Sequence, residues 1–214
     1  VTILLIDYHR LITRDALLPA GRLREPVSGK VRADILIVTK CPPGLDTDIR
    51  NAIRKELAPL PRQELFFTTL AYGKLQPLFV EAPERNLESV RTDEYILLLT
   101  GIASPAPLIK KLSEYSPHIV PLTFPDHHAF NASDIQCIKD RFGKLPEKKR
   151  FIVTTEKDAA RLIGHPDMDK NLIPYIYVLP ITVEFLDEEE KEMFNQNIID
   201  YVRENTRNSS LSEG

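Results

Sequence analysis

Three side chains suited to proton transfer or ion binding stand together in the stretch 123–131, at Asp126, His127 and His128. The apolar run 118–122 before them predicts a strand, and the apolar residues at helical spacing after Asn131 predict a capped amphipathic helix. In open α/β sheets such a strand-to-helix corner lies at the carboxyl edge, where ligands bind. The alternative interpretation is that Asp126 caps a turn and that both histidines are ordinary surface residues.

Two aspartates adjoin predicted buried strands in the first part of the chain. Asp7 follows the apolar run 3–6, and Asp34 precedes the run 35–38. A carboxylate at the edge of a sheet is suited to hold a Mg²⁺ water or to orient a phosphate. Because many buried strands end in Asp simply to begin the next turn, the position of Asp7 alone leaves both interpretations open.

The segment 8–33 contains many cations for a connecting loop. Within its block 18–26, Arg22 and Arg24 alternate on a turn bounded by prolines, so two guanidinium groups can point the same way. This arrangement suits a bidentate grip on a phosphate. The alternative is a solvated loop whose arginines pair with Asp15 and Glu25.

Composition restricts the class of protein. The chain has 214 residues, 43% of them hydrophobic, and a formal charge of −3. These values predict a packed, soluble protein and argue against nucleic acid as the main partner, since nucleic-acid-binding domains usually carry a basic excess. Cys41 and Cys137 lack the spacing of a zinc or redox site. No apolar run approaches the roughly 20 residues that span a bilayer.

The order of the predicted elements indicates two parts. Strands and helices alternate up to about residue 73, the composition changes over 81–93, and a new strand-helix alternation begins at residue 95. We expect strands near 75–80 and 175–185 to pair as a bridge, a helix over 187–205, and a disordered tail over 206–214. The first segment predicts a fully buried parallel strand without preceding neighbours, so we expect the chain to be a fragment.

Three groups of residues resemble the tetraacyldisaccharide 4′-kinase family, the lipid A kinases of Gram-negative bacteria. They are Asp7–Arg10 with the block Leu18–Pro26, the turn Thr100–Pro105, and Phe124–His128 with Thr154–Ala159. The resemblance implies two α/β/α sandwich lobes joined by a two-stranded β linker, with a P-loop core in the first lobe. The chain has no G-x-x-x-x-G-K-[ST] motif. Residues 1–73 are therefore expected to be the rear part of a truncated first lobe, and 74–186 the second lobe.

The resemblance also implies an activity. Family members transfer the γ-phosphoryl group of ATP, with Mg²⁺, to the 4′-hydroxyl of a tetraacyldisaccharide 1-phosphate at the cytoplasmic face of the inner membrane. By this resemblance the lipid disaccharide, ATP and the inner membrane surface are the expected partners, and we expect the isolated chain to be inactive. The implied site residues are His127 with Asp126 and with His128 as a second candidate for catalysis, Gly21, Arg22, Arg24 and Glu25 for substrate binding, and Asp34 or Asp7 for Mg²⁺.

Two other functions remain open from the residues alone. A glycosyltransferase-like lobe that binds a nucleotide sugar would show the same glycine turn and the same acidic or histidine residues at a sheet edge. A nonenzymatic α/β interaction domain would use the arginine-rich loop for an anionic partner. Neither function requires a P-loop.

Overall fold

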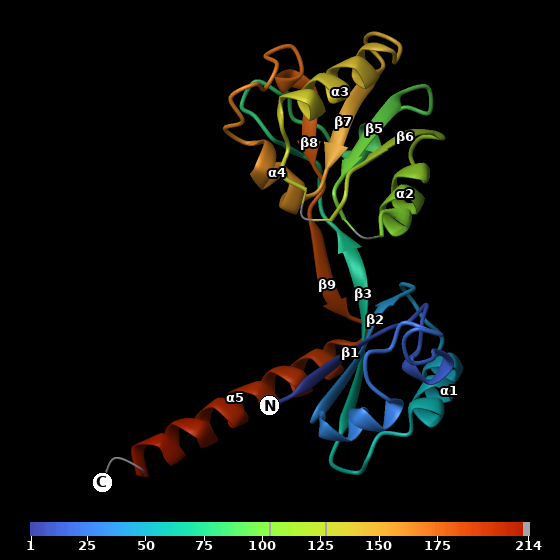
Figure 1. Cartoon of the computed structure of the whole chain (residues 1–214), viewed down its shortest axis with the longest axis vertical. Coiled ribbons are helices and arrows are strands. Elements are labelled where there is room, and N and C mark those ends of the chain that lie inside the picture. Colours follow the sequence, from blue (N-terminus) through green and yellow to red (C-terminus); the bar gives the residue numbers. More distant parts are fainter. Residues whose placement is uncertain (103, 127, 212–214) are drawn as a thin grey trace. The chain divides into compact units, whose positions relative to one another are not determined.

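The computed structural model describes residues 1–102, 104–126 and 128–211, with side chains described up to residue 203. The chain folds as two compact units (Figure 1). Unit 1 contains Val1–Ala71 and the described residues from Val183 on, and unit 2 contains Tyr72–Thr182. Each unit is a sheet with helices on both faces. The mixed α/β fold with two parallel-rich sheets is thus confirmed.

Unit 1 is built on a four-stranded sheet in the order β1-β2-β3-β9. Strands β1, β2 and β3 are parallel, with Ile3 opposite Ile35 and Asp7 opposite Thr39 in the first pair. Helix α1 covers one face, and the start of α5 covers the other through Phe194 and Ile198. The elements are β1 (Ile3–Asp7), β2 (Ile35–Cys41), α1 (Thr47–Leu57), β3 (Glu64–Tyr72), β9 (Ile181–Phe185) and α5 (Glu188–Leu211).

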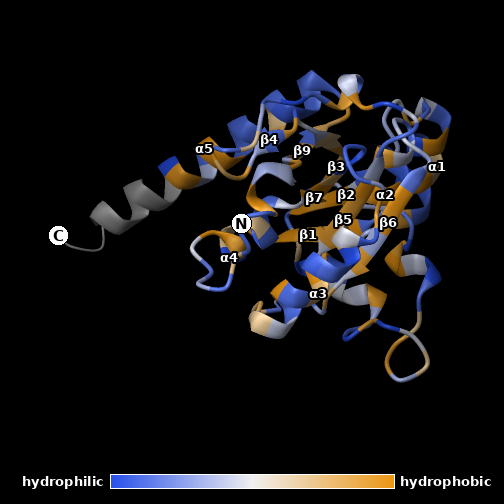
Figure 2. Cartoon of the chain, turned by 90° about the horizontal axis from the view of Figure 1, so that it is seen from above, coloured by the Kyte–Doolittle hydropathy of each residue, from blue (hydrophilic) through white to orange (hydrophobic). Residues whose placement is uncertain are grey.

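Unit 2 has a five-stranded sheet in the order β4-β8-β7-β5-β6, parallel except for β4. Its central strands are almost wholly apolar, as parallel strands covered on both faces must be (Figure 2). Helix α2 packs on one face, and α3 and α4 on the other. The elements are β4 (Gln76–Pro77), β5 (Tyr95–Thr100), α2 (Ala106–Ser113), β6 (His118–Thr123), α3 (Ala132–Gly143), β7 (Arg150–Thr154), α4 (Glu156–Leu162) and β8 (Ile176–Val178).

The expected pairing between the segments near 75–80 and 175–185 is present over a short length. The first segment contributes only β4, which pairs with β8 inside the sheet of unit 2. The strands that reach the division between the units are β3 and β9, which are neighbours in the sheet of unit 1. Pro77 explains the shortness of β4, because proline has no amide hydrogen to donate to a ladder.

One expectation about the C-terminal helix needs correction. Helix α5 continues to Leu211, six residues beyond the predicted end at 205. No Gly or Pro interrupts this segment, and an established helix gains one hydrogen bond for each residue it adds.

Strand β1 is parallel as predicted. It lies at the end of the sheet, where Leu5 is 63% exposed, which agrees with the expectation of an apolar strand without preceding neighbours.

The long loop of unit 1 is anchored to helix α1 by Glu56. Its carboxylate accepts hydrogen bonds from Arg14 Nε at 2.9 Å and from the Thr13 hydroxyl. The Arg14 hydrogen bonds, followed by that of Thr13, lower the pKa of Glu56 from its ordinary 4.5 to about 2. A depressed carboxyl pKa stabilises the folded state above the unfolded pKa, and this stabilisation is lost as the pH falls through the folded value.

We therefore predict that Glu56→Gln lowers the stability of unit 1 at neutral pH and that its difference from wild type disappears as the pH falls from about 4.5 to about 2. Urea unfolding across this pH range measures the effect. Glu192→Gln, at an exposed position on α5, is the matched control and should show no such convergence. A constant difference between Glu56→Gln and wild type at every pH would contradict the anchoring role.

Candidate functional site

The predicted corner lies at the carboxyl end of β6, next to the carboxyl end of β5. The amide of Phe124 donates to the Thr100 carbonyl at 2.8 Å, and the amide of His128 donates to the Pro125 carbonyl at 3.2 Å. Asp126 forms an ion pair with Lys157 Nζ at 2.5 Å, and both side chains are about 40% exposed. His127 lies outside the described residues. The structure thus places Asp126 at a half-open sheet edge beside a lysine.

His128 has a structural environment. Its Nε2 lies 2.8 Å from Asp134 Oδ2, and its ring stacks on Phe124 at a centroid distance of 4.9 Å. Asp134 belongs to the capping box of α3, which it forms with Asn131. Burial opposes ionisation of Asp134, but hydrogen bonds from His128 and from the Asn131 amide outweigh it and lower the pKa of this carboxyl group. The His128 imidazole is therefore tied to the helix start.

Asp158 connects the turns beneath this corner. Its side chain is fully buried, and its Oδ2 accepts hydrogen bonds from the Gly101 amide at 2.9 Å and from the Thr155 hydroxyl at 2.8 Å. Its Oδ1 lies 3.5 Å from Arg161. The carboxylate thus joins the end of β5 to the start of α4. A buried carboxylate needs such partners because its charge has lost its water.

Gly101 is the position where this network allows no side chain. A Cβ atom built there would lie 2.9 Å from Asp158 Oδ1 and 3.2 Å from the Pro125 carbonyl oxygen. The glycine therefore lets the β5 turn, the Asp158 carboxylate and the corner at Pro125 approach one another. The sequence predicted a tight turn at Gly101 but not this reason for it.

In unit 1, Asp7 lies at the carboxyl end of β1, as predicted. Its Oδ2 is 2.6 Å from Lys40 Nζ, and its Oδ1 accepts the His9 amide at 2.9 Å. Burial opposes ionisation, and the Lys40 hydrogen bond followed by that of His9 outweighs it and lowers the pKa of Asp7. About a third of the Asp7 side chain stays exposed. An ionised, accessible carboxylate at this edge is a suitable ligand for a hard cation.

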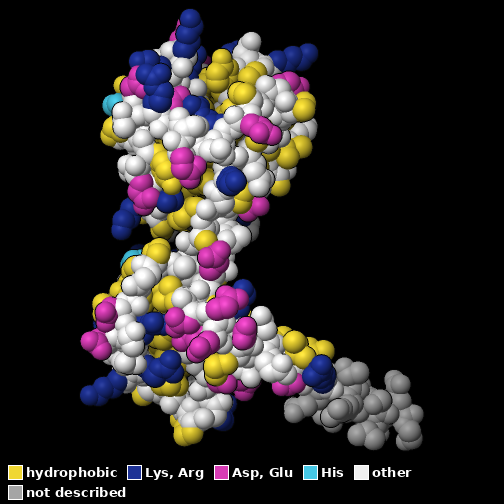
Figure 3. Space-filling view, turned by 180° about the vertical axis from the view of Figure 1, so that it is seen from behind, with side chains coloured by type: hydrophobic (Ala, Val, Ile, Leu, Met, Phe, Trp, Pro, Cys, Tyr) yellow, Lys and Arg dark blue, Asp and Glu magenta, His cyan; other side chains and the backbone are white. Residues whose placement is uncertain are grey.

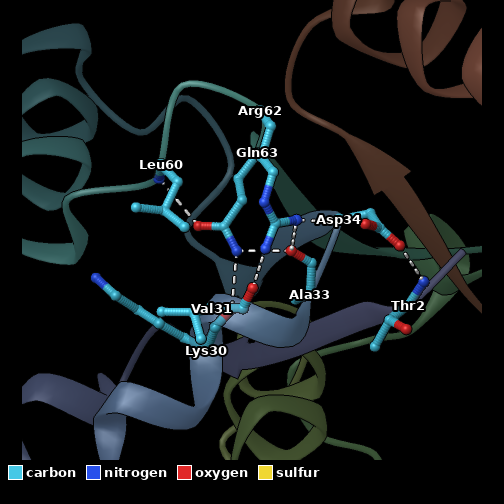
Figure 4. A network of polar contacts seen from close by, with 8 residues as sticks. All are labelled: Thr2, Lys30, Val31, Ala33, Asp34, Leu60, Arg62 and Gln63. Carbon is cyan, nitrogen blue, oxygen red and sulfur yellow. Dashed lines mark hydrogen bonds and ion pairs between the residues drawn. The ribbon is translucent and has the colours of Figure 1, made fainter.

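Asp34 lies at the opposite end of the sheet, just before β2. Its carboxylate accepts the Thr2 amide at 2.8 Å and lies 3.5 Å from Arg62, whose guanidinium also contacts the Val31 carbonyl (Figure 4). In parallel strands the amino ends share one edge and the carboxyl ends the other. Asp34 is level with Thr2 in the register of β1 and β2, so five residue steps separate it from Asp7, a length of roughly 16 Å. The structure does not bring the two carboxylates together.

The arginine-rich loop is folded by local contacts. Gly21 packs against the backbone of Ala16, where an added Cβ would lie 2.2 Å from the carbonyl oxygen. Asp15 pairs with Arg10 at 3.1 Å. Glu25 pairs with Arg32. The acidic residues proposed as partners in the solvated-loop interpretation are thus paired with arginines outside the 18–26 block.

The two candidate arginines are not equivalent. Both are exposed, and within the part of the chain that the structure describes neither guanidinium has a hydrogen bond or an ion pair. The Arg22 backbone amide donates to Asp15 at 3.2 Å. Arg24 differs in that it lines a cavity of about 380 Å³ together with Thr2, Leu23 and Pro26. No described contact links Arg24 to Asp7, so these predicted site residues form two separate places in unit 1.

Charged groups elsewhere add no further site. Among residues 1–102, 104–126 and 128–211, no three His, Cys, Asp or Glu side chains are grouped closely enough to enclose a metal ion. On the face drawn in Figure 3, basic and acidic side chains are interspersed.

Cys41 is buried, and burial raises the pKa of its thiol to about 11. Over the same described residues, no helix has the length and apolar character needed to cross a membrane.

Sequence reasoning missed three residues whose side chains position the corner of unit 2 or pair with the predicted site carboxylates. Asp158 was interpreted only as part of a helix start after Thr155, and its bond to Gly101 joins positions 57 residues apart. Lys157 and Lys40 had no predicted role, although each pairs with a predicted site carboxylate. The one available signal was that both lysines, like the aspartates they contact, follow predicted buried strands.

These features define an α/β protein whose parallel sheets each present a lysine-paired aspartate at the carboxyl edge. Residues 1–200 match the family model described as tetraacyldisaccharide-1-P 4′-kinase. The chain belongs to the tetraacyldisaccharide 4′-kinase family.

Relatives of this family support the assignment over the whole chain. The tetraacyldisaccharide 4′-kinase of Phocaeicola vulgatus is 56% identical over 212 residues, covering 99% of this chain and 58% of the relative. The tetraacyldisaccharide 4′-kinase of Bacteroides fragilis is 53% identical over 216 residues, covering 100% of this chain and 57% of the relative. A crystal structure of LpxK from Aquifex aeolicus in complex with ATP is 23% identical with a TM-score of 0.49, covering 90% of this chain and 51% of that chain. The chain thus spans little more than half of the relatives it matches.

We predict that Asp158→Ala destabilises unit 2 by about 3 kcal/mol, because it leaves the buried Gly101 amide and Thr155 hydroxyl without an acceptor. Hydrogen exchange of the β5 and β7 amides measures the loss. Asp140→Ala, an exposed aspartate on α3, is the control and should change stability by less than about 0.5 kcal/mol. Equal effects of the two substitutions would rule out the connecting role of Asp158.

Proposed function

We propose that this chain is the part of a tetraacyldisaccharide 4′-kinase that activates the acceptor hydroxyl and helps to hold phosphate groups. The reaction moves the γ-phosphoryl group of ATP to the 4′-hydroxyl of a tetraacyldisaccharide 1-phosphate at the cytoplasmic face of the inner membrane. The observation that carries this proposal is the match to the family model over residues 1–200. That match disfavours the glycosyltransferase-like and interaction-domain interpretations.

The corner of unit 2 is assigned to the sugar hydroxyl. His127 accepts or shares the proton of the attacking hydroxyl, a role suited to a histidine because its pKa lies near neutrality. Asp126 beside it supplies a negative charge that stabilises the protonated imidazole. Two observations favour His127 over His128: the His128 ring is bound to Asp134, and it is stacked on Phe124.

Unit 1 is assigned to phosphate and cation contacts. When bound, Mg²⁺ neutralises charge on the phosphate oxygens during transfer. Asp7 fits a cation ligand better than Asp34, because Asp7 lies at the carboxyl edge of the parallel strands, where ligands of open α/β sheets bind, whereas Asp34 lies at the other edge. A single carboxylate leaves the remaining positions to water and phosphate oxygens, as is usual for Mg²⁺.

The phosphate grip is assigned to Arg24, because this arginine lines the cavity of about 380 Å³ in unit 1 and Arg22 does not. Glu25 holds Arg32, and Gly21 allows the turn to close against Ala16, so these two residues shape the loop. Arg22 is the second candidate because it is exposed on the same loop.

A chimera tests the function of this chain directly. In it, the chain replaces the matching 212 residues of the Phocaeicola vulgatus relative. We predict that His127→Ala lowers kcat of the chimera by roughly 10²–10⁴, the usual effect of losing a general acid–base group. His128→Ala should lower the melting temperature and reduce kcat less. The assignment fails if His128→Ala has the larger effect on kcat or if neither substitution changes it.

The same chimera distinguishes the two arginines. A lysine keeps the charge but cannot form the bidentate hydrogen bonds of a guanidinium. We predict that Arg24→Lys lowers kcat/KM at least tenfold, about 1.4 kcal/mol, at an unchanged melting temperature. Arg22→Lys is the matched control with a smaller expected effect. Wild-type kinetics in Arg24→Lys would remove the phosphate grip from this residue, and the substrate whose KM changes would identify the phosphate that is held.

A further inference from the structure

Lys40 has an unusual backbone conformation at the carboxyl end of β2. Its φ angle is 59°, in the left-handed region that disfavours side chains with a Cβ atom. The register between β2 and β3 shifts between Val38 and Cys41, so Lys40 lies within an irregularity of the ladder. Such conformations persist only where the surrounding structure enforces them, and they are enriched at functional sites.

The side chain at this strained position reaches the neighbouring strand. Lys40 Nζ lies 2.6 Å from Asp7 Oδ2 on β1, while the His9 amide occupies Asp7 Oδ1. Each carboxylate oxygen therefore has one donor. A carboxylate can accept about four hydrogen bonds, so Asp7 retains capacity for another partner. The Lys40 side chain is 40% exposed and has room to move away from Asp7.

Stability alone does not explain this residue. An ion pair between two half-exposed side chains contributes little, because water screens it and both chains lose freedom. The left-handed backbone conformation of a residue with a Cβ atom costs a comparable free energy, so it offsets the stabilisation from the ion pair. Glycine at position 40 would avoid the strain, so folding stability alone gives no reason for a lysine at this position.

We propose that Lys40 is a positioning residue for Asp7: it keeps the carboxylate oriented in the metal-free protein and releases it when a divalent cation binds. The released ammonium group then lies beside the cation site, where it can contact an oxygen of a nucleotide phosphate. This inference rests on the proposed function, in which Asp7 contributes to holding Mg²⁺.

The test uses Mn²⁺ as a paramagnetic probe on the chain itself. Mn²⁺ bound at Asp7 broadens the backbone amide resonances of Tyr8, His9 and Arg10, and NMR detects this even for weak binding. We predict that Lys40→Met, which keeps the side-chain stem but removes the charge, lowers the Mn²⁺ concentration for half-maximal broadening about tenfold, a free-energy change of about 1.4 kcal/mol. Asp7→Asn should abolish the broadening.

A second pair of variants separates strain from positioning. Lys148 also has a left-handed backbone, with a φ angle of 62°, and lies in unit 2 before β7. Lys148→Gly should raise the melting temperature, since it removes backbone strain, whereas Lys40→Gly should change it little, because the loss of the ion pair with Asp7 offsets the relief of the strain. Only Lys40→Gly should strengthen Mn²⁺ binding. In the chimera, Lys40→Met should lower kcat at saturating Mg²⁺ and ATP, whereas Lys148→Gly should leave it unchanged.

The outcomes distinguish this inference from the function on which it rests. Equal Mn²⁺ affinity in Lys40→Met and wild type, with broadening abolished by Asp7→Asn, overturns the role of Lys40 and leaves that of Asp7 intact. Broadening that survives Asp7→Asn, with normal chimera activity of that variant, overturns the assignment of Asp7 as well. Absence of broadening in both wild type and Lys40→Met also overturns the proposal.

Discussion

The organisation of unit 2 depends on one buried charge, the carboxylate of Asp158. It has no access to water and is stabilised by the Gly101 amide, the Thr155 hydroxyl and the more distant Arg161. Satisfying it requires the end of β5 and the start of α4 to meet, and only glycine at position 101 leaves room for this contact. The backbone at Pro125 lies against the same glycine, so the corner that carries Asp126 is positioned by this network.

The parts of the fold with a periodic signal were predictable from the sequence. Continuous apolar runs indicated the parallel strands, and Asn131 indicated a helix start that the structure confirms with a side-chain cap. The sequence was less informative about the lengths of the elements. Pro77 limits β4 to two residues, and no Gly or Pro marks the end of α5.

The candidate site was predictable in its residue types but not in its connections. Asp7 and Asp126 were identified because each follows an apolar run, and both lie at carboxyl edges. Asp34 was grouped with Asp7 because it adjoins a similar run, yet it precedes its strand and therefore lies at the opposite edge. The contacts of Asp158 and Lys40 span 57 and 33 positions, and no local pattern encodes such separations.

A lysine accompanies the exposed aspartate at the carboxyl edge of each sheet. Lys40 lies 2.6 Å from Asp7 in unit 1, and Lys157 lies 2.5 Å from Asp126 in unit 2. Burial of such an aspartate would raise the barrier to its exchange of partners. A half-exposed ion pair avoids this difficulty, because it orients the carboxylate while remaining weak enough for a ligand to displace the lysine. Asp158 is buried instead and is bonded to the backbone and hydroxyl groups that join β5 to α4. Burial therefore separates the carboxylate that builds the fold from the two to which the proposed function assigns an exchange of partners.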